Sequence, residues 1–188
     1  SPTSVTATYA ANSRTLSITA NGGTLGGTVA GAKDYNTAIS ITNTASPASK
    51  YFTGWTSTNS VCTGTGACSF NMPDNDVTVT ASYADNTLTV TATNGNVTSS
   101  VGGCTGASCS VNFNQGTLVT LTANAVTGYT FTGWSGGGCS GTGTCVVTMN
   151  SPTSVTATYA INIYTVTFNK NGGDTEASPT TRVANHNT

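Results

Sequence analysis

An exact internal repeat constrains the fold of this chain more than any other feature of the sequence. The ten residues SPTSVTATYA stand at Ser1–Ala10 and return unchanged at Ser151–Ala160. Longer near-copies recur at a spacing of about 75 residues when the chain is aligned with itself. Because such arrays repeat one small structural unit, the sequence predicts a tandem-repeat protein and favours a structural or adhesive role over a single chemical site.

The landmarks of the repeat recur in the same order in two copies. Each copy has an aromatic segment that ends in Gly-Trp, a Gly- and Thr-rich segment between two cysteines, a methionine, and a closing strand that ends in tyrosine. In the two copies these landmarks are Tyr51–Trp55 and Tyr129–Trp134, Cys62–Cys68 and Cys139–Cys145, Met72 and Met149, and Val77–Tyr83 and Val155–Tyr159. We therefore place the boundaries between repeats near Ala84 and Ala160.

Two whole modules flanked by two partial ones are the predicted organisation. Residues 11–84 form module 1 and residues 85–160 form module 2, while residues 1–10 are the closing strand of a preceding repeat. Residues 161–188 are the opening hairpin of a third, incomplete repeat. A lone hairpin is marginal in water, so we expect either a longer natural chain or completion by another molecule. Strand complementation by the segment 1–10 of a second copy would polymerise the chain head to tail.

Alternating Thr and Val residues predict that nearly all of the chain is β-strand. The alternation places β-branched side chains on one face of each strand and hydroxyl groups on the other, and Asn-Gly turns separate the strands. It runs through residues 77–83, 87–93, 119–123, 155–159 and 164–168. No segment has a convincing helical period. The predicted fold class is all-β, with tandem small modules of a β-grasp-like or two-layer sandwich type.

The amino-acid composition limits the classes of molecule that the chain could bind. Only 6% of the residues are charged and the formal net charge is -1, so the chain lacks the basic surface that attracts nucleic acids and anionic membranes. No apolar run has the length of a membrane span. We therefore exclude nucleic acid and membrane insertion. The expected partners are neighbouring repeats or further copies of the chain, joined through edge strands, and polysaccharide.

Six cysteines fall into three close pairs: Cys62 with Cys68, Cys104 with Cys109, and Cys139 with Cys145. Each pair encloses Gly, Ser and Thr residues of the kind that turn a hairpin. The spacing therefore predicts disulfide-stapled hairpins, each worth about 2 kcal/mol in the chain-entropy estimate. Zinc is the alternative, but these spacings without a supporting histidine match zinc ribbons poorly. Disulfides indicate an oxidising compartment, so we expect a secreted or cell-surface protein.

The ordered set of motifs resembles the divergent branch of the internalin B-repeats. The set contains an opening strand, an Asn-Gly turn, the aromatic Gly-Trp segment, Cys-x-Gly-Thr-Gly-x-Cys, and the closing Ser-Val-Thr-Ala-Thr-Tyr. Tyr164–Gly173 is similar to the opening of the related Listeria-Bacteroides repeat. The resemblance implies a stalk or accessory module of a secreted or surface-anchored bacterial protein, a small β-grasp-like fold, and no catalytic residue. The Cys104–Cys109 segment and the lack of a clear helix depart from it.

Few residues are suited to catalysis or metal binding. The only histidine, His186, lies outside both whole modules, which disfavours a Ser-His-acid system. Asp74 and Asp76 form the one close acidic pair within the two whole modules. A turn is their favoured role over a glycosidase pair or a calcium site, because the second module has Asn150–Pro152 at this position and no distant bidentate carboxylate is evident. We therefore expect no enzymatic activity, no cofactor and no metal.

Trp55 and Trp134, with Tyr51 and Tyr129, are the best candidates for a binding site. Their rings could stack on sugars, and repetition would convert weak contacts into avidity. The favoured role is nevertheless to anchor the core of a module that is short of large aliphatic side chains. We expect a stalk or filament segment of a bacterial surface adhesin or matrix fibre. The alternative is a glycan-binding accessory module of a secreted hydrolase, which would show tryptophan fluorescence changes with polysaccharide.

Overall fold

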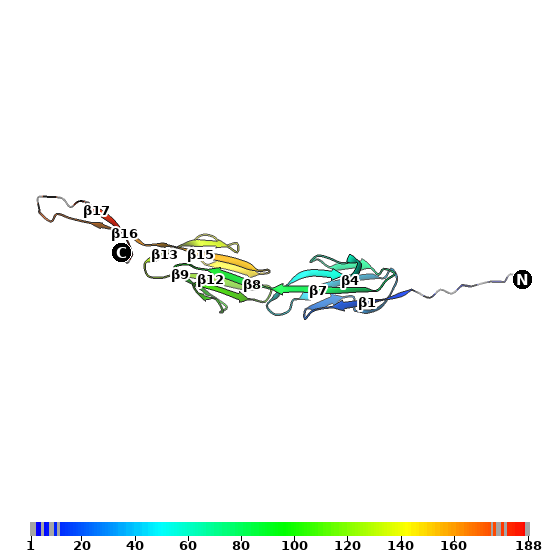
Figure 1. Ribbon diagram of the computed structural model, residues 1–188. Helices are drawn as coiled ribbons and strands as arrows, with labels where there is room; N and C mark the ends of the chain where they lie inside the picture. Colours follow the sequence, from blue (N-terminus) through cyan, green and yellow to red (C-terminus); the bar gives the residue numbers. More distant parts are fainter. Residues whose placement is uncertain are drawn as a thin grey trace. The chain divides into compact units, whose positions relative to one another are not determined.

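The computed structural model describes residues 3–4, 6–7, 10, 12–173, 175, 178 and 180–186. The chain divides into two compact units, residues 1–85 and 86–188. Each unit contains one β-sandwich (Figure 1), and we keep the names module 1 and module 2 for the two sandwiches. The closing strand expected at residues 1–10 lies largely outside the described residues.

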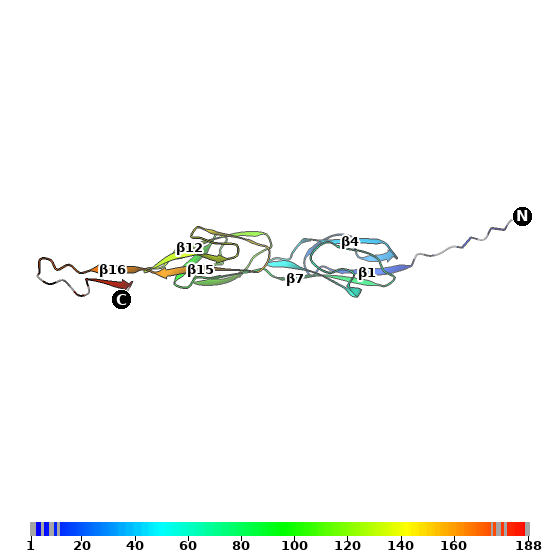
Figure 2. The same ribbon diagram turned by 90° about the horizontal axis from the view of Figure 1, so that it is seen from above.

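Module 1 is built from seven strands and one short 3-10 turn. In chain order they are β1 (Ser13–Thr19), β2 (Thr24–Gly27), β3 (Gly31–Asp34), β4 (Ala38–Ala45), β5 (Lys50–Ser57), η1 (Thr58–Ser60), β6 (Cys68–Asn71) and β7 (Val77–Asp85). One sheet has the order β3-β1-β7-β5, and the other has the order β2-β4-β6. Figure 2 shows the layer that contains β4 facing the layer that contains β1.

Module 2 repeats this topology with one additional strand. Its strands are β8 (Thr87–Thr91), β9 (Gly95–Ser99), β10 (Thr105–Gly106), β11 (Ser108–Asn112), β12 (Thr117–Ala125), β13 (Tyr129–Gly136), β14 (Cys145–Met149) and β15 (Thr153–Ile161). The two sheets have the orders β11-β8-β15-β13 and β10-β9-β12-β14. The additional strand is β10, which pairs with the edge of β9.

The prediction of tandem all-β modules is confirmed, and of the two alternatives the two-layer sandwich is the one observed. No described residue lies in an α-helix. The described part of the chain therefore also contains no helix with the length and apolar character of a membrane span. A second sheet, instead of a helix, covers the sheet that holds the first and last strands of each module.

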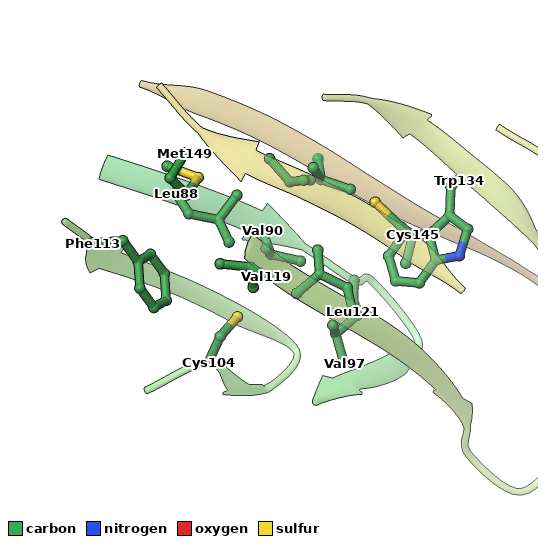
Figure 3. Packing of buried hydrophobic residues seen from close by; sticks show 14 of the residues in the cluster. Leu88, Val90, Val97, Cys104, Phe113, Val119, Leu121, Trp134, Cys145 and Met149 are labelled. Carbon is green, nitrogen blue, oxygen red and sulfur yellow. The ribbon is translucent and has the colours of Figure 1, made fainter. Parts of the chain in front are cut away.

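The period-2 pattern of the sequence explains the cores. In β15 the buried residues Val155, Ala157 and Tyr159 alternate with exposed Ser and Thr side chains. Figure 3 shows how such rows from the two sheets of module 2 interdigitate, with Leu88, Val90 and Leu121 at most 1% exposed. A separate cluster fills module 1. The many Thr residues therefore form the outer faces of the sandwiches, as expected for largely antiparallel sheets with one solvated face.

A two-stranded hairpin follows module 2. It consists of β16 (Ile163–Thr167) paired antiparallel with β17 (Thr181–Asn185). The backbone N–H of Asn162 donates to the carbonyl oxygen of Gly128 at 2.7 Å, which joins the start of the hairpin to module 2. The run Thr165-Val-Thr-Phe168 matches Thr87-Leu-Thr-Val90 of the opening strand of module 2. Val166 and Phe168 are nevertheless 46% and 44% exposed.

Candidate functional site: the tryptophan anchor and its disulfide loop

A β-bulge places the tryptophan of each module. The pairing of β5 with β7 shifts register between Phe52 and Gly54, which leaves Thr53 without an opposite residue. Gly54 has φ +134°, and a Cβ at this position would lie 2.8 Å from the carbonyl oxygen of Gly64. Only glycine combines this φ with so close an approach of two backbone segments. Module 2 has the same bulge between Phe131 and Gly133.

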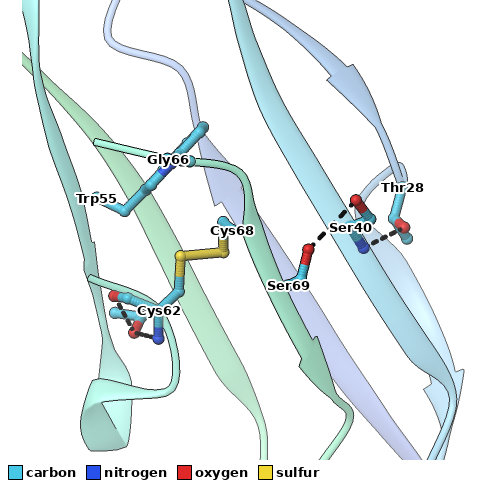
Figure 4. The surroundings of a disulfide bond; sticks show 8 residues. Thr28, Ser40, Trp55, Cys62, Gly66, Cys68 and Ser69 are labelled. Carbon is cyan, nitrogen blue, oxygen red and sulfur yellow. Dashed lines mark hydrogen bonds between the residues drawn. A yellow bond between two sulfur atoms is a disulfide. The ribbon is translucent and has the colours of Figure 1, made fainter. Parts of the chain in front are cut away.

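Trp55 binds the disulfide loop through two hydrogen bonds. Its backbone N–H donates to the carbonyl oxygen of Gly64 at 2.8 Å, and its indole Nε1–H donates to that of Gly66 at 2.7 Å. Figure 4 shows Trp55 and Gly66 beside the Cys62–Cys68 disulfide. The Gly-Trp segment and the cysteine segment of the sequence are therefore two halves of one structure.

Module 2 repeats this arrangement closely. The backbone N–H of Trp134 donates to the carbonyl oxygen of Gly141 at 2.9 Å. The indole Nε1–H donates to that of Gly143 at 2.6 Å. Because the same two bonds recur in both modules, the Gly-x-Gly spacing inside each cysteine pair is explained by the two carbonyl oxygens that it presents to the tryptophan.

Both tryptophan rings are covered. Trp55 is 3% exposed and Trp134 is 5% exposed. Each forms an edge-to-face pair with the phenylalanine before the bulge, with ring centroids 5.0 Å apart for Phe52 and Trp55. Edge-to-face pairs of this kind are favourable beyond the area they bury. Neither indole presents a free face on which a sugar ring could stack.

Tyr51 and Tyr129 do not occupy equivalent positions. Tyr51 is opposite Ala84, whereas Tyr129 is opposite Ile161 and takes the place that Lys50 has in module 1. Tyr129 packs against the core of module 2. Since successive residues of a strand point to opposite faces, Tyr51 lies on the outer face of its sheet. The structure therefore does not bring these two tyrosines into one repeated site.

The tyrosine of each closing strand joins the two sheets. The Tyr83 hydroxyl donates to Oδ1 of Asn43 at 2.7 Å, and the Tyr159 hydroxyl donates to the carbonyl oxygen of Asn96 at 2.8 Å. A Cβ on Gly95 would lie 2.2 Å from Cζ of Tyr159, so the ring needs a glycine beneath it. Burial raises the pKa of both tyrosine hydroxyls above the ordinary value of 10.0.

The three cysteine pairs are disulfides in the structure, with no free cysteine in the described part of the chain. They differ from the expected stapled hairpins, because each closes a loop that passes from one sheet to the other. β5 pairs with β7 and β6 pairs with β4, so the 62–68 segment joins strands that are not neighbours. The Cys104–Cys109 bridge likewise links the segment before β10 to β11, which pairs with β8.

The acidic turn of module 1 is occupied by structural contacts. Asp74 forms an ion pair with Arg14 at 2.8 Å and accepts a hydrogen bond from the Asn12 amide. Asp76 accepts the backbone N–H of Thr15 at 2.7 Å. These carboxylates therefore hold the start of β1 against the start of β7. Among the described residues, no group of three or more His, Cys, Asp or Glu side chains could hold a metal ion.

Sequence reasoning missed an asparagine at each junction between repeats. The signal was present, because Tyr-Ala-x-Asn occurs three times and ends at Asn12, Asn86 and Asn162. Each asparagine carbonyl oxygen accepts a backbone N–H from the end of the strand that pairs with the opening strand. The donors are Tyr35 at 2.9 Å, Phe113 at 2.9 Å and His186 at 3.0 Å. Asn86 is fully buried and also donates its side-chain amide to the Met149 carbonyl oxygen at 2.7 Å.

Comparison with known proteins agrees with this repeat structure. A protein-family model described as the divergent InlB B-repeat domain matches residues 15–87 and 86–163. Each match spans one sandwich, from the opening strand to just beyond the closing strand. Searches of curated proteins and of solved structures found no match. The chain therefore belongs to the divergent InlB B-repeat domain family and carries two tandem copies of that domain.

Proposed function

We propose that this chain is an extracellular structural repeat that forms a stalk or filament segment of a bacterial surface protein. The observation that carries the proposal is the use of every repeated landmark inside the fold. The tryptophans, the closing tyrosines and the cysteines all hold one sheet or loop to another. The repeated residues therefore maintain the sandwich fold. Tandem repetition of such a unit lengthens the protein.

An extracellular location follows from the chemistry of the cysteines. All six are paired: two of the disulfides close the loops that hold the tryptophans, and the third links the segment before β10 to β11. Thiols in a reducing cytosol stay unpaired, whereas small extracellular modules with thin cores gain stability from disulfides. The producing bacterium should therefore display or secrete the chain. An antibody against module 1 should label unpermeabilised cells, and labelling only after permeabilisation would contradict the proposal.

Glycan binding is the weaker function for these modules. That alternative depended on stacking by Trp55 and Trp134, whose rings are 3% and 5% exposed. Each indole instead packs in an edge-to-face pair with the phenylalanine before the bulge, Phe52 or Phe131. A polysaccharide would have to bind to the hydroxyl-rich outer faces of the sheets. The repeat does not place a landmark aromatic side chain at the same position on these faces in both modules.

The third opening hairpin supports assembly through strand addition. In module 2 the parallel neighbour of β8 is β15, with Val155 opposite Val90. The strand β16 has the same sequence pattern as β8, but its Val166 and the following Phe168 are exposed. A strand with the sequence of Ser151–Ala160 could pair beside β16 as β15 pairs beside β8. Within an array the next repeat supplies such a strand, and Ser1–Ala10 of a second copy has the same sequence.

Negative-stain electron microscopy of the purified chain at several concentrations tests this assembly. Head-to-tail addition predicts fibres whose length grows with concentration and whose growth is lost on deletion of residues 1–10. The matched control deletes residues 187–188, which lie beyond β17 and should leave the fibres intact. Separate particles at every concentration would contradict polymerisation and leave the modules as segments of a stalk.

A further inference from the structure

We propose that each module is a force-bearing unit in which the first and last strands resist tension along the chain. We call these two strands the terminal pair: β1 with β7 in module 1, and β8 with β15 in module 2. The inference rests on the proposed stalk function for its biological setting.

The terminal pair is the only parallel pairing among the described strands of each module. In module 1, Leu16 lies opposite Val77 and Thr19 lies opposite Thr80. In module 2, Leu88 lies opposite Thr153 and Thr91 lies opposite Thr156. The other described strand pairs are antiparallel. The chain thus enters and leaves each sandwich through two adjacent strands that run in the same direction.

The parallel direction of the two strands determines how tension on the chain acts on the terminal pair. Tension on the chain pulls β1 toward its amino end at Ser13 and pulls β7 toward its carboxyl end at Asp85. These ends lie at opposite ends of the paired segment, so the two strands are forced to slide past each other. The slanted hydrogen bonds of the parallel ladder are then loaded together. An antiparallel terminal pair would instead be opened from one end, one hydrogen bond at a time.

The core protects the terminal pair from water. On its inner face Leu16, Val77 and Val79 are at most 1% exposed. In module 2, Leu88, Val90 and Val155 are at most 2% exposed. Sliding by two residues would move these side chains out of register with the facing sheet, so the ladder cannot shear without disrupting close packing. The barrier to forced unfolding therefore combines several hydrogen bonds with the loss of core contacts.

The disulfides lie outside the terminal pair and limit how far a module extends after it yields. Cys62 and Cys68 are six residues apart in sequence and 5.3 Å apart between their Cα atoms, so an intact bridge withholds about 15 Å of extended chain from module 1. Module 2 has two bridges with separations of five and six residues, which together withhold about 27 Å once the spans across the bridges are subtracted. Reduction should lengthen the two unfolding steps by these different amounts and so identify each module in a pulling trace.

Single-molecule pulling in two geometries tests the inference. In the first, handles at the two chain termini load both terminal pairs by sliding. In the second, one handle stays at the amino terminus and the other is attached to an azide-bearing amino acid in place of Asn75, which is exposed and precedes β7. Asn12 and Asp74 are hydrogen-bonded, so this geometry pulls on neighbouring ends of β1 and β7 and peels them apart.

The proposal predicts a several-fold higher unfolding force for module 1 in the first geometry, because forced unfolding follows the rate of barrier crossing along the pulled direction. Equal forces, or a lower force between the termini, would overturn it. The Asn75-labelled chain must have the same thermal stability as the unlabelled chain. A difference in unfolding force then reflects the pulling direction and not a change in folding. The outcome is independent of cell-surface labelling, which tests the stalk function separately.

Discussion

Trp55 donates its indole N–H to the carbonyl oxygen of Gly66, 2.7 Å away, inside the loop that the Cys62–Cys68 disulfide closes. Trp134 makes the equivalent bond to Gly143 in module 2. The ring is buried because it fills the corner where the chain crosses from one sheet to the other. The most recognisable motif of the repeat thus has an architectural explanation.

Replacing Trp55 with phenylalanine should destabilise module 1. Trp55→Phe removes the hydrogen bond to the Gly66 carbonyl oxygen and reduces the volume of a 3% exposed side chain, which together should cost about 2 kcal/mol. Tyr51→Phe is the control, because Tyr51 is partly exposed on the outer face, and it should change stability by less than about 0.5 kcal/mol. Urea unfolding followed by circular dichroism measures both. Equal stability of the two variants would refute a structural role for the indole.

Gly95→Ala should destabilise module 2 without any effect of backbone strain. Its new methyl group would lie 2.2 Å from Cζ of Tyr159 and force the ring out of place, at a cost of about 1–3 kcal/mol. Gly143→Ala is the matched control, since a Cβ there meets nothing within 4 Å. Thermal unfolding distinguishes the two. If both variants unfold at the same temperature as the parent, the tyrosine does not need the glycine.

Alkaline pH should weaken the modules through their closing tyrosines. Burial raises the pKa of the Tyr83 hydroxyl above 10.0, so folding favours its protonated form. This contribution to stability is fully present below pH about 10 and is lost as the pH rises through the raised pKa of the folded state. Tyr83→Phe should therefore lose less stability than the parent between pH about 9 and about 11, the range that extends about one unit on either side of the ordinary tyrosine pKa.

Urea unfolding across this pH range provides the measurement. Tyr35→Phe is the control for the general effect of removing a tyrosine, because its side chain is 60% exposed. It should follow the parent at every pH. A Tyr83→Phe profile as steep as that of the parent would show that the Tyr83 hydroxyl makes no such contribution.

The Cys104–Cys109 bridge should stabilise module 2 alone. Cys104 is 1% exposed and belongs to the core of module 2, and Cys109 lies opposite Val90. The double variant Cys104→Ala, Cys109→Ala should lower the stability of module 2 by about 2 kcal/mol and leave module 1 unchanged. Denaturant unfolding with tryptophan fluorescence measures module 2 in a Trp55→Phe background, where Trp134 is the reporter, and module 1 in a Trp134→Phe background, where Trp55 is the reporter. An unchanged midpoint would contradict the prediction.

Sequence reasoning predicted the strands well because their pattern is local. The alternation of Val77 to Tyr83 lies in β7, and the alternation of Thr87 to Thr91 forms β8. The repeat landmarks likewise predicted the Gly-Trp and cysteine segments as units of a tandem module. Burial of the two tryptophans followed from the shortage of large aliphatic side chains, which leaves few other residues able to fill a core.

The remaining features depend on contacts between distant residues. The cysteine loops resemble hairpins in sequence, but β6 joins β4 in the second sheet, and the spacing of Cys62 and Cys68 carries no information about that choice. Tyr51 and Tyr129 were aligned by identity, whereas strand pairing places Tyr129 with Lys50. The parallel pairing of Leu16 with Val77 joins strands from opposite ends of the module. A period-2 pattern does not indicate whether two strands pair in parallel or antiparallel orientation.

Tryptophan fluorescence of the native, oxidised chain tests most directly the claim that the repeat landmarks build the module and form no ligand platform. Trp55 and Trp134 are the only tryptophans, so the signal reports these two positions alone. Burial predicts a blue-shifted emission that resists iodide quenching and does not change when bacterial, plant or host polysaccharides are added. An emission typical of water-exposed indole, with a saturable shift on adding a polysaccharide, would contradict the account.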